Sequence, residues 1–255
     1  MTASPVNGKL GSYRTALVTG GTGGVGSAVV REFIAAGLMV TAGARAKDRL
    51  DLLKSEVGCD TIVLDLSRPR TVMQALEGRS FDVVVNNAGI MPAAGPFHSL
   101  PAEGIFDTVD VNLSGALAVT RALLPGQVER GSGHIFFISS MFGPYAAPNA
   151  AVYGATKAAL RAFSKGLRLD LVGTGVRVTE VAPGRIETEF FRSSMGDMAV
   201  VREKLFANYR SLQPSDVSSA IVYALGLPAH ADVNLIELTS TDQALGGGSF
   251  ATHKG

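Results

Sequence analysis

The sequence predicts a single α/β domain spanning residues 1–255, in which helices cover both faces of a doubly wound sheet of seven mostly parallel strands. Short apolar runs of strand type alternate along the chain with longer segments of helical periodicity. Of the residues, 46% are hydrophobic and 18% are charged, which is typical of a globular protein with a large interior. No Pro/Ser-rich linker or block of charge divides the 255 residues, so we expect one large domain rather than two small ones.

Each expected strand is a short apolar run that polar residues or glycine follow. The expected strands lie at 15–19, 38–43, 60–65, 81–89, 134–140, 176–184 and 233–238. The expected helices between them lie at 26–37, 47–58, 71–78, 107–130 and 153–172. Strands that alternate with helices pair in parallel, and such sheets bind ligands beyond the carboxyl ends of their strands. We therefore expect the functional residues directly after the strands.

Charge and cysteine content exclude several classes of function. The net charge is +1, and no basic stripe or polybasic run favours nucleic acid or an anionic membrane as partner. The single cysteine, Cys59, excludes an intrachain disulfide, and no Cys/His grouping has metal-ligand spacing. Residues 1–12 lack the features of a signal peptide, and no apolar run is long enough to span a membrane. We expect a cytoplasmic protein with a flexible N-terminus at 1–12 and no metal.

A glycine-rich stretch, TGGTGGVG at 19–26, separates the first expected strand from the first expected helix. Unpaired N–H groups and the positive dipole end of a helix N-terminus attract phosphate, and glycine lets a ligand approach the backbone closely. A plain turn is the alternative reading of the glycines. The strand, loop and helix setting favours the pyrophosphate site of a Rossmann-type domain, although the spacing is TG-x-x-x-G-x-G rather than G-x-G-x-x-G.

The end of the second strand favours NADP(H) over NAD(H). An acid at this point typically binds the ribose 2′-hydroxyl, whereas an arginine suits a 2′-phosphate. This chain has Ala44 and Arg45 there and no carboxylate, and a guanidinium can bind phosphate through two parallel hydrogen bonds. A solvated loop arginine is the alternative. Many NADP binders also carry a basic residue just before the middle glycine of the loop, and here that residue is Gly23.

Polar residues also end the third and fourth strands. Asp65 is placed to accept a hydrogen bond from the adenine amino group or to stabilise a turn, and the two roles are equally favoured. Asn86 and Asn87 directly follow a buried apolar run, so we expect them to bond the strand-end backbone and line a cofactor channel.

The stretch YGATK places Tyr153 and Lys157 four residues apart, on one face of an expected helix. A nearby ammonium stabilises phenolate and so is expected to lower the pKa of the tyrosine toward neutrality. Tyr153 is thus a candidate proton donor and acceptor. Ser140 ends the fifth strand and is expected beside the phenol. Asn112, polar in an otherwise apolar helical segment, is expected to hold a water behind the lysine or to bend the helix locally.

Together these motifs resemble the short-chain dehydrogenase/reductase family over nearly the whole chain. They are, in order, residues 19–26, Asp65, NNAG at 86–89, Asn112, Ser140, Tyr153, Lys157, and PG at 183–184 with Thr188 after it. The resemblance implies that Tyr153 is the general acid/base. It implies that Lys157 binds the nicotinamide ribose and lowers the pKa of Tyr153, that Ser140 orients the substrate oxygen, and that Asn112 supports a water-linked proton relay.

The same resemblance implies contacts with NADP(H) along the ends of the strands. The residues expected to make them are Gly20, Thr22, Gly24, Val25, Gly26, Arg45, Asp65, Leu66, Asn87, Ala88, Gly89, Tyr153, Lys157, Pro183, Gly184, Ile186 and Thr188.

The loops at 90–100, 141–152 and 185–213 are expected to select the substrate. The last of these has apolar faces interrupted by charges and predicts short helices that form a lid, with an ordinary surface helix pair as the alternative. Arg185 and Arg192 are candidates to anchor an acidic group of the substrate beside Ser140 and Tyr153, or are solvated.

A looser resemblance links the C-terminal part to NADP-dependent 3-hydroxy acid (serine-type) dehydrogenases, sulfoacetaldehyde reductases and clavulanic-acid-type reductases. In that subgroup the chain after the last strand extends onto neighbouring subunits. The resemblance implies a homodimer or homotetramer with a C-terminal arm at 241–255, which is polar and rich in glycine.

The sequence therefore predicts an NADP(H)-dependent oxidoreductase of a small polar alcohol or carbonyl compound, with an acid group on the substrate. The alternative within the enzyme class is a ketoreductase of a larger secondary metabolite, polyol or steroid-like ketone. A remote alternative from another class is a regulator that senses NADP without turnover, which the presence of Ser140, Tyr153 and Lys157 disfavours.

Overall fold

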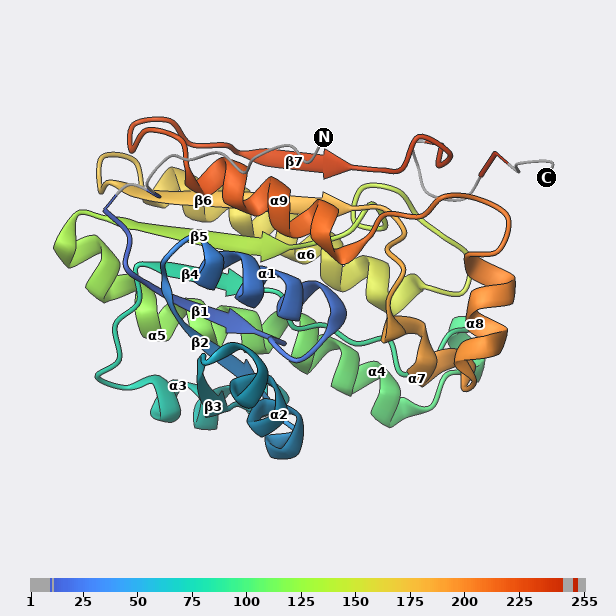
Figure 1. The fold of residues 1–255 in the computed structure, drawn as a ribbon. Coiled ribbons are helices and arrows are strands. Elements are labelled where there is room, and N and C mark those ends of the chain that lie inside the picture. The colour runs from blue at the N-terminus through green and yellow to red at the C-terminus, as the bar shows by residue number, and fades with distance from the viewer. Residues whose placement is uncertain (1–9, 11, 245–249, 252–255) are drawn as a thin grey trace.

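The computed structural model describes residues 10, 12–244 and 250–251, and it confirms the predicted α/β fold. Figure 1 shows one central sheet with helices packed against both of its faces. All seven strands run parallel, in the order β3-β2-β1-β4-β5-β6-β7. Their bounds are β1 (Thr15–Thr19), β2 (Met39–Ala44), β3 (Asp60–Val63), β4 (Val83–Asn86), β5 (Gly133–Ile138), β6 (Val176–Pro183) and β7 (Leu235–Leu238).

The helices of the described residues connect these strands. They are α1 (Gly24–Ala35), α2 (Lys47–Val57), α3 (Pro69–Leu76), α4 (Ala102–Val109), α5 (Gly115–Arg130), α6 (Ala151–Asp170), α7 (Arg192–Met195), α8 (Met198–Leu205) and α9 (Pro214–Leu225). Short 3₁₀ turns lie at Phe97–Ser99 and Glu189–Phe191, and a π-helical turn at Asp110–Ser114 joins α4 to α5. The helix expected at 107–130 is thus continuous from α4 to α5 but locally underwound at the π-helical turn.

Two apolar cores lie on the two faces of the sheet. On one face α1, α2 and α9 bury side chains such as Phe33 and Ile221 against the strands. On the other face α3, α5 and α6 do the same with Leu76 and Leu160. Figure 1 shows α1 and α9 in front of the sheet and α5 and α6 behind it. The central strands β4, β5 and β6 are buried along their whole length, so a ligand cannot reach their faces and has to approach them at their ends.

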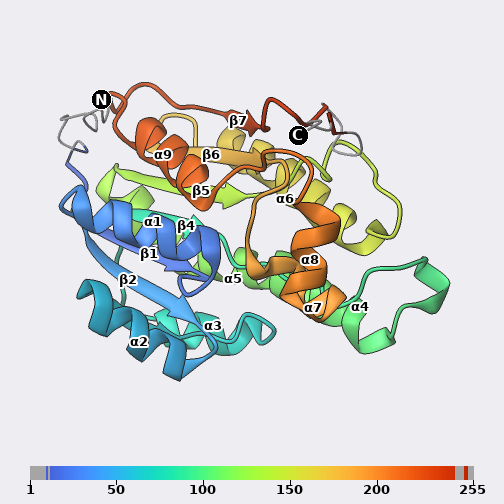
Figure 2. The ribbon, with the colours of Figure 1, turned by 45° about the vertical axis from the view of Figure 1, so that its right-hand side comes forward.

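The order of the strands reverses between β1 and β4. The chain passes from β1 outward to β2 and β3 and then returns to place β4 on the other side of β1, as the pairing of Ala16 with both Val40 and Val83 shows. In open α/β sheets such a point leaves a crevice beyond the carboxyl ends of the strands. Helices α7 and α8, in the segment predicted as a lid, lie at this end of the sheet in both views (Figures 1 and 2).

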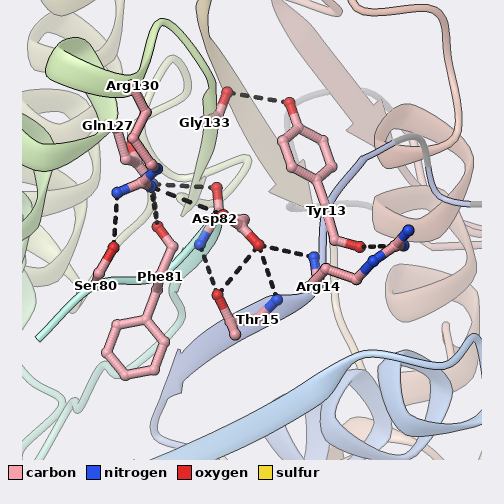
Figure 3. Close-up of polar contacts among 9 residues, drawn as sticks. All are labelled: Tyr13, Arg14, Thr15, Ser80, Phe81, Asp82, Gln127, Arg130 and Gly133. Atoms are coloured by element: carbon pink, nitrogen blue, oxygen red, sulfur yellow. Dashed lines mark hydrogen bonds and ion pairs between the residues drawn. The ribbon is translucent and has the colours of Figure 1, made fainter.

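The opposite end of the sheet is closed by polar contacts (Figure 3). One carboxylate oxygen of Asp82 accepts hydrogen bonds from the backbone N–H of Arg14 at 2.7 Å and from that of Thr15 at 3.0 Å, which ties the start of β1 to the start of β4. The side chain of Gln127, near the end of α5, donates to the carbonyl oxygens of Phe81 and Asp82. These bonds satisfy backbone groups at the starts of β1 and β4.

The ends of the chain were predicted only in part. Leu10 falls in the segment expected to be flexible, yet it is buried in the core beneath α9, because an apolar side chain gains free energy by leaving water. The rest of that segment, apart from Ser12, lies outside the described residues, as do 245–249 and 252–255 of the expected arm. Within the described part of the chain, no helix combines the length and the apolar character needed to cross a bilayer.

Candidate active site

One cleft of about 1230 Å³ opens beyond the carboxyl ends of β1, β2, β4, β5 and β6. It brings together the residues that the sequence predicts for the site, except Asn86 and Asn112. Asn86 was expected to line the channel, but it is buried, and its Nδ2 atom donates to the hydroxyl of Thr120 at 3.2 Å rather than to the strand-end backbone. The predicted residues that line it are Gly20, Thr22, Gly24, Val25, Gly26, Arg45, Asp65, Leu66, Asn87, Ala88, Gly89, Ser140, Tyr153, Lys157, Pro183, Gly184, Arg185, Ile186, Thr188 and Arg192.

The glycine loop forms a cradle that side chains would fill. Gly20 has a φ of 64°, in the left-handed region that favours glycine. A Cβ atom on Gly26 would lie 2.1 Å from the carbonyl oxygen of Gly20, and one on Gly24 would lie 2.6 Å from Cγ2 of Thr188. Gly23 caps α1 without a side chain, so the N–H groups of the first turn are left for another partner. This geometry suits the pyrophosphate of a dinucleotide.

Asn87, just after β4, fixes the loop from the neighbouring strand. Its Nδ2 atom donates to the carbonyl oxygens of Thr19 at 3.0 Å and Gly20 at 3.2 Å. The hydroxyl of Thr19 in turn accepts from the backbone N–H groups of Asn87 and Ala88. Asn87 therefore bonds the strand-end backbone as the sequence suggests, and it does so at the point where the strand order reverses.

The end of β2 places two arginines in the cleft. Arg45 is exposed, and its guanidinium forms no hydrogen bond or ion pair with any residue that the structure describes. Arg49, in the first turn of α2, was not predicted as a site residue. Its Nη2 atom donates to the carbonyl oxygen of Thr22 at 3.2 Å and lies 3.8 Å from a carboxylate oxygen of Glu189. The KDRL stretch gave no local signal for this role, since an arginine early in a helix is ordinarily solvated.

The contacts of Asp65 agree with a role in stabilising a turn rather than with a hydrogen bond to adenine. Its Oδ1 atom accepts hydrogen bonds from the backbone N–H of Ser67 at 3.1 Å and from the Ser67 hydroxyl at 2.7 Å, and its Oδ2 atom lies 3.5 Å from Nε of Arg68. The carboxylate thus closes the loop after β3, while the residue itself still lines the cleft beside Leu66.

Tyr153 and Lys157 project into the cleft from the first turns of α6. The Nζ atom of Lys157 lies 5.6 Å from the centroid of the Tyr153 ring and donates to the carbonyl oxygen of Ile138 at 2.8 Å. Ser140 follows β5, accepts a hydrogen bond from the backbone N–H of Phe142 at 3.1 Å and is hydrogen-bonded to the phenol. Serine, phenol and ammonium therefore meet at one point of the cleft.

Burial controls the proton affinities of this group. It raises the pKa of Tyr153 to about 12, and the hydrogen bond from Ser140 opposes this rise only in part. It lowers the pKa of Lys157 to about 8. The pKa of Tyr153 was expected to fall toward neutrality beside Lys157, but burial of the phenol outweighs the opposing effects and the pKa rises.

Asn112 lies beneath the cleft, in the π-helical turn between α4 and α5. Its Oδ1 atom accepts from the backbone N–H of Ile90 at 2.7 Å, and its Nδ2 atom donates to the Ile90 carbonyl at 2.9 Å. It is fully buried and also reaches the hydroxyl of Thr156 at 3.3 Å. Its side chain thus holds the loop after β4, and the local bend predicted for the helix is the π turn, a feature frequent at functional sites.

Gly89, after β4, lies close to the side chains of both Asn112 and Lys157. A Cβ atom on Gly89 would lie 3.3 Å from Nζ of Lys157 and 3.5 Å from Oδ1 of Asn112. A side chain at Gly89 would therefore crowd the ammonium of Lys157, which must shift slightly to make room for it.

The turn after β6 is braced by the C-terminal segment. Oε1 of Gln243 accepts from the backbone N–H of Arg185 at 2.9 Å, and a Cβ atom on Gly184 would lie 2.2 Å from that oxygen. Gln243 lines the cleft, although the sequence gives no signal for it. Ile186 pairs with Leu212 in a bridge that joins the two ends of residues 185–213, the predicted lid segment.

The two arginines proposed to hold the substrate differ in their surroundings. The guanidinium of Arg185 is hydrogen-bonded to the hydroxyl of Tyr209, and its Cζ atom lies 4.3 Å from the ring centroid of Phe250. Arg192 is exposed, with its Nη1 atom 4.0 Å from Glu189. Arg185 is held in place by the lid segment and the C-terminal segment, so Arg192 has the greater freedom to reach a substrate.

Aromatic side chains form the wall of the cleft nearest Tyr153. The ring centroid of Phe190 lies 5.5 Å from that of Tyr153, and the ring centroid of Phe142 lies 6.3 Å from it. The stretch containing Phe190 and Phe191 was predicted as part of the lid but not as a set of site residues. Among the described residues, no group of three or more His, Cys, Asp or Glu side chains is placed to hold a metal.

Comparison with known proteins agrees with this geometry. The sequence model of the family described as short chain dehydrogenase matches residues 14–198. The NADP-dependent 3-hydroxy acid dehydrogenase YdfG of Escherichia coli K12 is 40% identical over 241 residues, which cover 91% of this chain and 96% of that protein. An uncharacterized short-chain type dehydrogenase/reductase of Sinorhizobium fredii, y4eK, is 39% identical over 239 residues, which cover 94% and 96%.

A solved structure, the closed form of serine dehydrogenase complexed with NADP+, is similar with a TM-score of 0.87. It is 37% identical in sequence, and the match covers 94% of this chain and 100% of that one. The relatives named here are dehydrogenases, and the two with an assigned reaction are named with NADP. The predicted resemblance and the predicted class of enzyme are confirmed, and the chain belongs to the short-chain dehydrogenase family of oxidoreductases.

Proposed function

We propose that the protein is an NADP(H)-dependent oxidoreductase that interconverts a small, acid-bearing alcohol with its aldehyde or ketone. The observation that carries the proposal is the meeting of Ser140, Tyr153 and Lys157 in the cleft that also contains the glycine loop. The alternative is that the buried lysine and phenol have only a structural role. Burial of a cation without a carboxylate partner destabilises the fold, so this alternative is disfavoured.

Tyr153 is the group that moves the proton. With a pKa near 12 its phenol is protonated at neutral pH, which suits donation to the oxygen of a carbonyl substrate as that oxygen gains negative charge. Ser140, hydrogen-bonded to the phenol, orients the same oxygen. When bound, the cofactor supplies the hydride that the carbonyl carbon accepts. In the reverse direction Tyr153 must first lose its proton, and the ammonium of Lys157, 5.6 Å from the centroid of its ring, is placed to stabilise the resulting phenolate.

The cleft fits NADP(H). The glycine loop and the open N-terminus of α1 accommodate the pyrophosphate, and Arg45 is free to bind the ribose 2′-phosphate at the end of β2. The NADP named with two relatives supports this choice. Tyr153 and Lys157, together with the turn from Pro183 to Thr188, would hold the nicotinamide end.

The acid-bearing substrate is supported by Arg192 and by the relatives. The name of the Escherichia coli relative specifies a 3-hydroxy acid, and that of the solved structure specifies serine. Arg192 lines the cleft and is engaged only by a distant, exposed carboxylate, so it is available to bind a substrate carboxylate or sulfonate. Arg185, held by Tyr209 and Phe250, positions the lid segment instead.

A larger, apolar ketone is the second candidate, favoured by the rings of Phe142 and Phe190 around Tyr153. The two candidates are separated by assaying NADPH oxidation with a panel of semialdehydes, sulfoacetaldehyde and bulky ketones. We expect turnover of the acidic compounds, with a KM that rises at least about tenfold in Arg192→Gln. A KM for these compounds that Arg192→Gln leaves unchanged, or turnover of bulky ketones alone, would contradict the acid-bearing substrate.

We further propose a homodimer or homotetramer located in the cytoplasm, in which the arm at 241–255 contributes to association. The described part of that segment, through Gln243 and Phe250, contacts the lid segment of the same chain. Light scattering of the full chain and of a chain ending at residue 240 tests this: loss of the oligomer on truncation is the expected result.

A further inference from the structure

The glycine loop lacks a cation at the position where one is expected. Gly23 occupies that position, and a Cβ atom there would meet only the carbonyl oxygen of Gly20, at 3.3 Å. The guanidinium of Arg49 lies next to this point, because its Nη2 atom donates to the carbonyl oxygen of Thr22 at 3.2 Å. A cation from α2 therefore contacts the backbone of the loop beside the position that Gly23 leaves without a side chain.

Other cations near this end of the cleft are occupied elsewhere. Lys47, two residues before Arg49, is paired with Asp51 of its own helix, and Arg68 is paired with Asp65. Neither of these basic residues lines the cleft, whereas Arg45 and Arg49 both do. Arg45 and Arg49 thus supply the positive charge in the cleft at the end of β2.

The ion pair of Arg49 is a weak one. Its Nη2 atom lies 3.8 Å from Oε2 of Glu189, and the two side chains are 55% and 60% exposed. An exposed pair at such a distance stabilises a protein little, whereas a phosphate dianion offers a guanidinium shorter, charge-assisted hydrogen bonds. The guanidinium is therefore able to exchange Glu189 for a phosphate.

We propose that Arg49 is a specificity-determining residue for NADP(H): with Arg45 it binds the ribose 2′-phosphate, in place of the loop cation that Gly23 lacks. This inference rests on the proposed NADP(H) function. It gives Glu189 a defined role as well, since this carboxylate of the lid segment competes for the same guanidinium and repels the phosphate.

The test is a fluorescence titration of the full-length protein with NADPH and with NADH. In Arg49→Gln we expect the Kd of NADPH to rise about tenfold and that of NADH to change less than about twofold, because only NADPH carries the 2′-phosphate. Lys47→Gln is the matched control: it removes the same charge from the same helix turn outside the cleft, and should leave both constants unchanged. An unaltered ratio of the two constants in Arg49→Gln would overturn the proposal.

Two further measurements secure the result. The fragment 2′,5′-ADP, which has the 2′-phosphate but no nicotinamide, should lose affinity for Arg49→Gln, and Arg49→Lys, which restores the charge, should recover part of it. Glu189→Gln should tighten NADPH binding severalfold without affecting NADH. A loss of affinity for NADPH and NADH alike in Arg49→Gln, unrelieved in Arg49→Lys, would show that Arg49 only supports the loop, and would overturn the assignment.

The outcome distinguishes this inference from the function on which it rests. Equal affinities of the wild-type protein for NADPH and NADH would contradict the proposed cofactor itself. A wild-type preference for NADPH that survives in Arg49→Gln but disappears in Arg45→Gln would leave the proposed function intact and overturn only the role of Arg49.

Discussion

The Nζ atom of Lys157 donates a hydrogen bond to the carbonyl oxygen of Ile138 at 2.8 Å, and this is the one hydrogen bond that the described structure gives to the ammonium. The ammonium is buried, and its pKa falls to about 8 from a usual value of 10.5. The folded protein therefore binds this proton less tightly than the unfolded chain does. Lys157 destabilises the fold at neutral pH, and the penalty disappears as pH rises from about 8 to 10.5.

Lys157→Met should consequently stabilise the protein while it removes activity. We expect a gain on the order of 2 kcal/mol in the free energy of unfolding at neutral pH, because the buried charge is gone, and loss of most turnover. Urea denaturation at about pH 7 and at about pH 10 measures the effect, since the advantage of Lys157→Met should shrink at the higher pH. A variant that is less stable than wild type at both pH values contradicts this account.

Tyr153 should make the two directions of the reaction differ in their dependence on pH. Its phenol, with a pKa near 12, is protonated throughout the neutral range, so carbonyl reduction needs no ionisation of this group. Alcohol oxidation needs phenolate and should accelerate as pH rises above about 7. The profiles of kcat/KM for both directions measure this, with Tyr153→Phe as the inactive control. An oxidation rate independent of pH between about 7 and 10 would indicate that another group takes the proton.

Gly26 should tolerate no side chain, in contrast to a glycine with open surroundings. A Cβ atom at Gly26 would lie 2.1 Å from a backbone oxygen, whereas one at Gly166, in the middle of α6, has no atom within 4 Å. Gly26→Ala should therefore abolish NADPH binding, and Gly166→Ala should leave it intact while raising stability by about 0.5 to 1 kcal/mol through helix propensity. NADPH affinity and thermal unfolding of both variants check this, and normal affinity in Gly26→Ala would refute it.

Local patterns in the sequence predicted much of this site. The spacing of Tyr153 and Lys157 fixes their relation on one helix, and the alternation of strands and helices places the glycine loop at the carboxyl end of β1. Such features depend only on neighbours in the chain, so periodicity and turn chemistry are enough to find them.

Contacts between distant segments could not be predicted in the same way. Nothing near Arg185 in the sequence indicates that Tyr209 and Phe250 hold its guanidinium, or that Gln243 binds its backbone. The pKa of Tyr153 was likewise expected from one neighbour, Lys157, whereas burial by the whole surrounding structure decides it. Packing between elements, rather than the elements themselves, is what the sequence alone left open.

His134 should make the fold sensitive to acid. The ring is fully buried in β5, with Nε2 2.8 Å from the hydroxyl of Thr179, and Nδ1 has no partner among the described residues. Burial, and to a lesser degree the charge of Arg177, hold its pKa well below the usual 6.5. Between that depressed value and about 6.5 the unfolded chain binds a proton that the folded protein does not. Stability is therefore complete above about pH 6.5 and falls as the pH drops, by up to about 1.4 kcal/mol per pH unit.

His134→Gln tests this, because the glutamine amide can still bond Thr179 but cannot take up the proton. We expect the variant to lose less stability than wild type between about pH 7 and pH 5, even if it is the less stable protein at pH 7. Denaturant titrations at each pH measure the slope, and His98→Gln, at an exposed position, is the matched control that should keep the slope of the wild type. An unchanged slope in His134→Gln would assign the acid sensitivity to carboxylates, because these groups take up protons in the unfolded chain at lower pH.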